Sequence, residues 1–493
     1  MNLKKVRSEL ILAAIITIFG VIYGLISLVN HYLYRTYALD LGMFNQAMYC
    51  FSHFKMNYFT LDVKAHEISY FGDHFSPITI LLSPLYYLFG SYTLLLVQIF
   101  FILYGGVGIY KFVCFQHKKP SLSLILVLQF FCIWGIYFAL SSDYHNNVIA
   151  AMMVPWLLYY YVKKNHKGFI IFFFLILITK ENMALWLGFI MLGLIIKNLR
   201  RHHLKADLKQ ILKFEFPYMM VSFLYFIIVV SVVMPYLNPI QEINPVNRYD
   251  HLGGSIYQIF LNIINNPRYI FSLLFESPLL TESSFGAKSE LHFMVLVSGG
   301  FALIYRPYYL IMLIPVYFQK LLTLSPSLWG VNAQYSIEFV PILTIALSDF
   351  LLKFKSAKVR YLIAAITTVS TIWFTYGVLE SNKIVWYNKT NTAFYEKAHY
   401  ETTLNVKEIN TVLKSIPDKV PVSVNATVAP HLANRERLYH FPVVKEAKYI
   451  VLMLDNYYPL TGEEFFNKIN ECTEKENFRI KYAENGLLIL KKD

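Results

Sequence analysis

Charged side chains are scarce in this sequence. Asp, Glu, Lys and Arg make up 15% of its 493 residues, whereas an ordinary soluble protein contains about 25%. Hydrophobic residues account for 56% and aromatic residues for 17%. This composition excludes a disordered chain and argues against a purely soluble enzyme. It predicts a membrane protein with several spanning helices.

Cysteine is rare, and familiar catalytic motifs are missing. The four cysteines form neither CxxC pairs nor a regular spacing, so a disulfide framework and a cysteine-based zinc site are excluded. The sequence contains no P-loop, no GxGxxG between a strand and a helix, no GxSxG and no HExxH. ATP hydrolysis, dinucleotide redox chemistry and zinc proteolysis therefore have no support.

Eleven apolar stretches predict membrane-spanning helices, since a span needs about 20 mostly apolar residues. They lie at residues 10–30, 91–113, 121–140, 147–162, 169–186, 184–199, 215–235, 291–305, 307–323, 337–352 and 359–379. The first lacks a small-residue cleavage site and is expected to be a span rather than a signal peptide. The fifth and sixth overlap because the polar run 179–182 breaks the pattern. Residues 77–90 are short and contain prolines, so we expect a half-buried or re-entrant segment there.

Lysine and arginine predict the orientation of the spans, because cytoplasmic loops collect them. With the amino terminus in the cytoplasm, inner segments hold 20 of these residues and outer loops hold 8. The net charge of +13 therefore reflects topology, and no nucleic-acid partner is expected. Twelve acidic residues fall on the outer side. Since acids hardly influence orientation, their bias indicates that the chemistry lies on the outer face.

Two regions of the chain differ in composition. Residues 1–379 predict a transmembrane domain, with a first outer loop at 31–76 and a large outer loop at 236–290 that carries short surface helices. From residue 380 to 493, hydrophobic runs shorten and charges become frequent, which predicts a small extracytoplasmic α/β domain. Its expected helices are 402–416, 427–433 and 461–474, and its expected strands are 420–424, 448–454, 478–482 and 486–491.

Asp40 is the first candidate site residue. It stands at the start of a helical pattern that predicts a surface helix. The apolar positions of that helix are Leu41, Phe44, Ala47, Met48 and Phe51. Asp40 either caps the helix by accepting backbone N–H bonds or serves as a general base at the membrane surface. The two roles can coexist, because a cap supplies the fixed position that a base needs.

Two Asp–His pairs fall at other outer ends of spans. Asp73 and His74 close the first outer loop, where they either orient a phosphate or a metal or lie in a solvated loop. Asp143 and His145 lie between the third and fourth spans, in a loop whose polar groups suit cations or sugars. Asp143 is equally suited to capping the helix that follows it.

Further candidates lie near the later spans. Lys180 and Glu181 stand at an outer membrane edge, where ionisable residues are costly and often functional. They form either a local ion pair or a site in which Lys180 holds a phosphate. Tyr335, before the tenth span, is an interfacial anchor or a substrate contact, and Glu338 begins that span. Because all these residues map to outer span ends, we expect one site at one membrane face.

The sequence resembles a bacterial and archaeal membrane-protein family catalogued as domain of unknown function 2079. The resemblance is carried, in order, by Asp40-Leu41-Gly42-Met43-Phe44-Asn45-Gln46, His74-Phe75-Ser76-Pro77-Ile78, Ser83-Pro84-Leu85-Tyr86, Asp143-Tyr144-His145, Lys180-Glu181, Tyr335-Ser336, Ala429-Pro430-His431-Leu432-Ala433-Asn434-Arg435 and Phe441-Pro442. Two positions depart from the family pattern. Asn182 stands where a second acid is common, and Gln334 where a histidine precedes the Tyr-Ser pair, which weakens a metal site there.

This family in turn resembles the GT-C membrane glycosyltransferases. Those enzymes carry an acidic residue in the first outer loop, take sugars from polyprenyl-phosphate carriers and work on the extracytoplasmic face. The resemblance implies a GT-C-like fold with Asp40 as the catalytic base, and it extends to Asp73, His74 and Lys180.

The resulting hypothesis is a plasma-membrane enzyme that transfers a sugar from a polyprenyl-phosphate donor to a glycan, lipid or protein acceptor. Asp40 removes the acceptor proton. The predicted substrate- and phosphate-binding residues are His74, His145, Lys180, Glu181, Tyr335 and Glu338. A divalent cation, Mg²⁺ or Mn²⁺, has candidate oxygen ligands in Asp40, Asp73 and Asp143.

The carboxyl-terminal domain and the overall activity both have alternative interpretations. His431 and Arg435 are candidates for acceptor binding, and the alternative is that this domain only packs as a cap on the membrane domain. A lipid or glycan transporter or flippase is the second functional hypothesis, although it would be expected to show inverted repeats. A non-catalytic scaffold in envelope assembly is the third.

Overall fold

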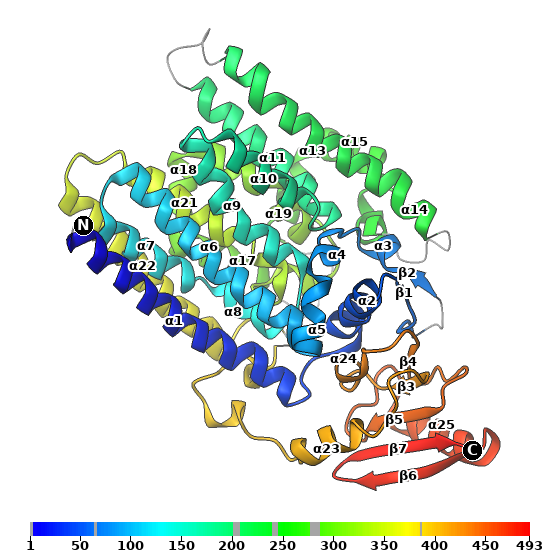
Figure 1. Ribbon diagram of the computed structural model, residues 1–493. Coiled ribbons are helices and arrows are strands. Elements are labelled where there is room, and N and C mark those ends of the chain that lie inside the picture. Colours follow the sequence, from blue (N-terminus) through cyan, green and yellow to red (C-terminus); the bar gives the residue numbers. More distant parts are fainter. Residues whose placement is uncertain (1–2, 64–66, 201–207, 239–244, 277–285, 385–386) are drawn as a thin grey trace.

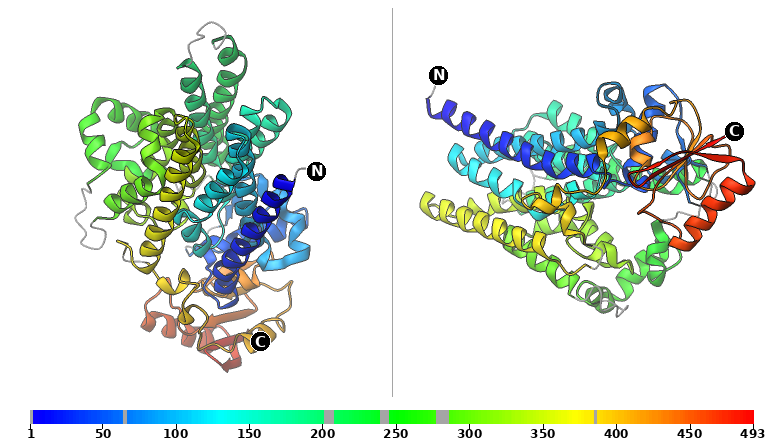
Figure 2. Two further views of the ribbon diagram at one scale, coloured as in Figure 1. Left: turned by 90° about the vertical axis from the view of Figure 1, so that its left-hand side faces the viewer. Right: turned by 90° about the horizontal axis from the view of Figure 1, so that it is seen from below.

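Helices make up most of the molecule, and a small sheet lies beyond one end of them (Figure 1). The computed structural model describes residues 3–63, 67–200, 208–238, 245–276, 286–384 and 387–493. The predicted outer acids Glu242 and Glu282, and the predicted inner residues Arg201 and Lys205, lie outside the described residues. Helix α1 (Leu3–Tyr32) runs from the far end of the bundle to the end that carries the sheet (Figure 2).

Six stretches of the described residues are long and apolar enough to cross a membrane. They are Val6–Tyr32, Ile78–His117, Glu181–Leu199, Leu208–Leu237, Ala287–Tyr305 and Ala357–Glu380. A seventh span is added when α7 (Pro120–Phe131) and α8 (Trp134–Ser141), which meet at a 43° bend, are counted together. The prediction of a helical membrane protein is thus confirmed, whereas the count of eleven spans is not.

The remaining predicted spans form shorter helices. They are α9 (Asn146–Val162), α10 (His166–Leu177), α19 (Pro307–Leu321) and α21 (Phe339–Leu351). The predicted stretch 169–186 is wrong at its end, because Lys180 is extended and separates α10 from α11 (Glu181–Leu199). Every residue of α21 is buried, so this helix contacts protein rather than lipid.

Several of the long stretches are built from consecutive helical segments. The Leu208–Leu237 stretch contains η4 (Ile211–Glu215), α13 (Phe216–Ile228), η5 (Val229–Val233) and α14 (Met234–Leu237). The next contains α17 (Ala287–Val295), η8 (Leu296–Gly300) and α18 (Phe301–Tyr305). The last is α22 (Ala357–Glu380). Leu208–Leu237 and α22 expose many apolar side chains, as contact with lipid chains requires.

The first outer loop folds against the carboxyl-terminal region. Its π-helical turn η1 (Ala38–Gly42) leads into α2 (Met43–Ser52), followed by β1 (Tyr58–Phe59), β2 (Ile68–Ser69) and α3 (Tyr70–Asp73). The prediction of a surface helix is wrong, since nine of the ten α2 residues are buried. The amides of Asn45 and Gln46 donate to the carbonyl oxygens of Pro430 and Glu436, at 3.3 and 2.8 Å. The helix is therefore covered by the carboxyl-terminal region.

Two other predicted surface segments consist of short helices. Residues 77–90 form α4 (Ile78–Leu82), η2 (Ser83–Leu85) and α5 (Tyr86–Phe89), and they continue through η3 (Gly90–Tyr92) into α6 (Thr93–His117). The described part of the large outer loop holds η6 (Pro245–Leu252), α15 (Ile256–Asn265) and α16 (Pro267–Leu273). Tyr257, Phe260 and Ile264 on α15 are exposed, which gives this helix an apolar outer face.

The carboxyl-terminal sheet has five strands in the order β4-β3-β5-β7-β6. Strands β3 (Val422–Val424), β4 (Leu438–His440) and β5 (Tyr449–Met453) are parallel, and β6 (Phe478–Glu484) and β7 (Leu487–Lys492) are antiparallel to their neighbours. Helices α23 (Val406–Leu413), α24 (Ala429–Leu432) and α25 (Gly462–Lys475) match the three predicted helices. The expected helix 402–416 is too long at both ends, and β4 was not predicted.

Candidate functional site

Asp40 lies at the end of the bundle that carries the sheet. It belongs to the turn η1, and its side chain is 49% exposed. The backbone on both sides of Asp40 is held by another carboxylate, because Asp143 accepts the N–H groups of Tyr37, at 2.8 Å, and of Leu41. Asp40 is thus an accessible carboxylate on a fixed backbone.

Both capping interpretations are wrong. The residues that precede η1 and α2 are Tyr37 and Gly42, and neither helix receives a side-chain cap there. Asp143 does not cap α9 either, since His145 occupies that position without a side-chain bond. Its carboxylate instead accepts backbone N–H groups of the first outer loop, those of Tyr37 and Leu41.

Asp143 and Asp40 are close enough to influence one another. Burial raises the pKa of Asp143 well above its ordinary value, and the Asp40 carboxylate raises it further, while the two backbone N–H bonds act in the opposite direction. Two adjacent carboxylates favour one protonated and one ionised member. The buried Asp143 is the member whose protonation is favoured.

His145 is the nearest basic side chain to Asp40. Its Nε2 lies 3.9 Å from Asp40 Oδ1 and donates to the Ser142 carbonyl at 2.8 Å. Its backbone N–H donates to Gln98 Oε1 at 3.0 Å, and the Gln98 amide donates to the Asp143 carbonyl. Burial lowers the pKa of His145 to about 4, although Asp40 raises it. His145 is therefore neutral at neutral pH, with its position fixed.

His74 approaches the same place from the end of the first outer loop. Its ring nitrogens lie 3.7 Å from Asp73 Oδ2 and 4.0 Å from Glu181 Oε1. Glu181 also accepts the Phe75 backbone N–H at 3.0 Å, which joins the start of α11 to this loop. The ring of Phe44 lies 6.1 Å from that of His74 and 6.4 Å from that of His145, so it lies near both imidazoles.

Lys180 connects this group to the start of α21. Its ammonium interacts electrostatically with His145 and Glu338. Asn147 donates to Glu338 Oε1 at 3.0 Å and to the Gln334 carbonyl at 3.2 Å. Tyr335 lies in the adjoining turn η9 (Gln334–Ser336), where it interacts electrostatically with Tyr249 of the large outer loop.

The predicted residues from four separated segments therefore meet. We call the central group the Asp40 cluster, and it consists of Asp40, Phe44, His74, Asp143, His145, Lys180 and Glu181. Glu338 adjoins it through Asn147, and Tyr335 lies beyond Glu338. Two contributors were missed by the sequence prediction: Phe44 was taken only as a helix face, and Gln98 was not considered. Asn147 was predicted only as one of the polar groups of the loop 143–147. Gln98 carried a signal, since it is a polar residue inside a long apolar run.

The family of the chain follows from its comparison with family models. Residues 30–489 match the model described as "Predicted membrane protein (DUF2079)". The chain belongs to this family. The match spans the whole Asp40 cluster and the carboxyl-terminal sheet up to β7, so both are parts of the DUF2079 unit. No curated protein matches the chain.

The predicted metal ligands of this DUF2079 protein do not form one group. Within the part of the chain that the structure describes, no three His, Cys, Asp or Glu side chains are arranged to hold a metal ion. Asp143 is engaged by backbone N–H groups, and Asp73 lies against His74. Asp40, Asp73 and Asp143 therefore do not fit a shared Mg²⁺ or Mn²⁺ site. The use of a metal ion by this protein stays a prediction.

The two predicted acceptor residues pack rather than face outward. His431 stacks against His31 and Tyr34, with ring centroids 4.2 and 4.0 Å apart. Arg435 is buried and donates to the carbonyl oxygens of Leu432, Pro417 and Val420. His431 thus joins the carboxyl-terminal region to the end of α1. Arg435 joins segments within the carboxyl-terminal region.

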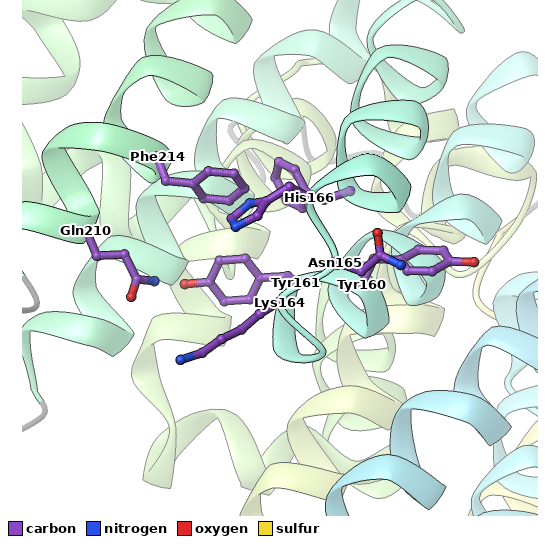
Figure 3. Close-up of a pocket in the computed structure, with 8 residues that line it drawn as sticks. Tyr160, Tyr161, Lys164, Asn165, His166, Gln210 and Phe214 are labelled. Atoms are coloured by element: carbon purple, nitrogen blue, oxygen red, sulfur yellow. The ribbon is translucent and has the colours of Figure 1, made fainter.

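A separate pocket of the DUF2079 chain lies at the opposite end of α9 (Figure 3). It has a volume of about 180 Å³ and is lined by Tyr160, Tyr161, Lys164, Asn165, His166, Phe169, Gln210 and Phe214. Helix α9 begins beside His145 and ends beside this pocket, so about 25 Å separate the two places at 1.5 Å per residue. The pocket is therefore not part of the Asp40 cluster.

Proposed function

We propose that this chain is a membrane glycosyltransferase of the GT-C type. It would move a sugar from a polyprenyl-phosphate donor to an envelope acceptor at the extracytoplasmic face of the plasma membrane. The observation that carries the proposal is the half-exposed Asp40 carboxylate, whose flanking backbone is held by the buried Asp143. A general base needs this combination of access and fixed position.

The neighbours of Asp40 supply the remaining chemistry. The Asp40 carboxylate takes the proton of an acceptor hydroxyl while that oxygen attacks the anomeric carbon of the sugar. The bond between this carbon and the phosphate oxygen breaks, and its electron pair leaves with the polyprenyl phosphate. Lys180 and His74 stabilise the negative charge of the leaving phosphate. Neutral His145 keeps the site polar without pairing permanently with Asp40.

The proposed membrane face of the reaction rests on the distribution of Lys and Arg along the chain. The basic residues at the start of α1 and after α9 and α11 lie at the helix ends away from the Asp40 cluster. Because cytoplasmic loops collect Lys and Arg, this charge distribution supports an outer position for the cluster. The starts of α9 and α11 lie at that cluster together with the end of α1. The donor would then enter from the outer leaflet, with its polyprenyl chain in lipid.

The test measures release of polyprenyl phosphate. The full chain is reconstituted in phospholipid vesicles with polyprenyl-phosphate-linked glucose, galactose, mannose or N-acetylglucosamine, and with a lipid extract of bacterial envelopes as acceptor. We expect release with at least one donor, and a loss of about 100-fold or more in Asp40→Asn, because general-base catalysis contributes that much.

The matched control is Asp250→Asn. Asp250 is an exposed carboxylate in η6 and is not a member of the Asp40 cluster, so its loss should leave the rate unchanged. Release by wild type that persists in Asp40→Asn would remove Asp40 from the mechanism. Movement of a donor lipid across the vesicle membrane without any release would contradict the transferase and favour the flippase hypothesis.

A further inference from the structure

The carboxyl ends of three parallel strands meet at one edge of the terminal sheet. β3 lies between β4 and β5. From β3 the chain continues through α24 to β4, which lies on one side of β3 in the sheet. From β5 it continues through α25 to β6 and β7, which lie in the opposite direction along the sheet. The connections therefore diverge between β3 and β5, and in open α/β sheets ligands bind at such a point, outside the carboxyl ends of the strands.

Three polar atoms at this edge are buried and have no hydrogen-bond partner among the described residues. They are Thr427 Oγ1, His440 Nε2 and Asn456 Oδ1. Each comes from the carboxyl end of a different strand: Thr427 follows β3, His440 ends β4 and Asn456 follows β5. Thr427 is 9% exposed and His440 is 0% exposed. Buried polar groups are normally paired, so three such atoms at one edge point to a ligand with hydroxyl groups.

An exposed aromatic ring lies beside His440. Tyr458 is 54% exposed, and its ring centroid lies 6.0 Å from that of His440. An exposed aromatic face next to unsatisfied donors and acceptors suits a ligand with an apolar face and polar edges. A sugar ring has both features.

The edge adjoins the Asp40 cluster. A Cβ atom on Gly42 of η1 would lie 3.3 Å from the Ala429 Cβ at the start of α24. Burial raises the pKa of Tyr37, and the Asp143 and Asp455 carboxylates raise it further. Asp455, which follows β5, therefore lies near the residue whose backbone N–H binds Asp143.

We propose that the carboxyl edge of β3, β4 and β5 binds a neutral carbohydrate through Thr427, His440, Asn456 and the ring of Tyr458. Its role as the acceptor site rests on the proposed transferase function, whereas the binding itself does not. The site differs from His431 and Arg435, which are engaged in packing. It would present a sugar hydroxyl toward the face on which Asp40 lies.

The experiment measures sugar binding directly. The full chain is placed in phospholipid nanodiscs, without sugar-based detergent, and saturation-transfer NMR is recorded with the methyl α- and β-glycosides of glucose, galactose and mannose. We expect at least one of the six probes to bind. Thr427→Val and Tyr458→Ala should each weaken its binding about fivefold or more. Thr427→Val removes a hydroxyl that has no protein partner, so the fold should keep its thermal stability.

Two further variants separate the possible outcomes. Tyr257→Ala removes another exposed tyrosine, on α15, and should leave binding unchanged. Asp40→Asn should also retain binding, because it changes only the proposed base. The proposed sugar site would be overturned if none of the six glycosides showed saturation transfer. Equal binding by wild type and both edge variants would overturn it as well. Binding that depends on the edge, in a protein that releases no polyprenyl phosphate, would keep the site and reject the transferase.

Discussion

Asp143 shows how one buried side chain can position another residue. Its carboxylate accepts the backbone N–H groups before and after Asp40, so it fixes the position of the residue that we propose as the general base. Burial and the nearby Asp40 charge both favour the protonated form of Asp143, since each raises its pKa. A neutral acceptor at this position is therefore sufficient to hold both N–H groups.

Amide and alanine substitutions at Asp143 should have different effects. Asp143→Asn keeps an oxygen that accepts the Tyr37 N–H, so we expect release of polyprenyl phosphate within about threefold of wild type. Asp143→Ala leaves buried N–H groups unpaired, which costs about 1–3 kcal/mol and should displace Asp40. We expect kcat to fall with little change in KM for the donor. Equal loss in both variants would show that the charge, and not the acceptor oxygen, is needed.

The sequence indicated which of these residues lie together but not which contacts they make. Asp40, His74, Asp143, His145, Lys180 and Glu181 all met at one end of the bundle, as their placement at outer span ends predicted. The predicted capping roles of Asp40 and Asp143 were wrong, because a local sequence pattern assigns each Asp to the helix that follows it. The bond that forms joins positions 106 residues apart, and only the packing of α8, α9 and η1 determines it.

At the scale of elements, helix presence was predictable and helix length was not. Each of the eleven apolar stretches contains a helix, yet only six or seven candidate spans result. Polar and extended residues such as Lys180 end helices within apolar runs. Short helices like α21 persist because they are buried on all sides.

An ion pair joins three of these helices at the end distant from the Asp40 cluster. Lys197 on α11 lies 2.9 Å from Asp349 on α21, and Tyr308 on α19 donates to the same carboxylate at 2.5 Å. Both charged side chains are largely buried. Lys197→Met should destabilise the protein by about 3–5 kcal/mol, because it removes the cation paired with the buried Asp349 carboxylate. Thermal unfolding in nanodiscs measures this loss.

Two companion variants test the cause of that loss. Lys197→Met combined with Asp349→Leu should recover most of the stability, since an apolar pair of similar volume replaces the buried ion pair. Lys397→Met breaks an exposed pair with Glu401 and should change stability by less than about 1 kcal/mol. A double variant as unstable as Lys197→Met alone would assign the loss to packing rather than to the unpaired charge.

At the scale of the whole molecule, the carboxyl-terminal region is docked rather than tethered. Arg35, just after α1, donates to the carbonyl oxygens of His399 and Glu401, and Asn30 donates to that of Asn391. Composition predicted a separate α/β unit and most of its elements. It could not predict that α2 would be buried under this unit, because an amphipathic helix presents the same pattern to lipid, water or protein.

The stacked imidazoles at this junction make its stability depend on pH. His431 on α24 packs on His31 and Tyr34 of the α1 end, and burial lowers its pKa to about 3, compared with about 6.5 when it is exposed. The detached form therefore takes up a proton first. Docking should weaken as the pH falls from about 6.5 toward 3, by about 1.4 kcal/mol per pH unit.

Hydrogen exchange of the segment 406–492 at pH 7 and pH 5 measures this change. Between these values we expect docking to lose about 2 kcal/mol in wild type, so that exchange in the segment becomes faster. His431→Phe keeps a flat ring between the same neighbours and cannot take up a proton. It should therefore show a smaller loss between pH 7 and pH 5. An equal pH dependence in both proteins would assign acid sensitivity to other groups, such as buried His440, whose pKa is also lowered by burial.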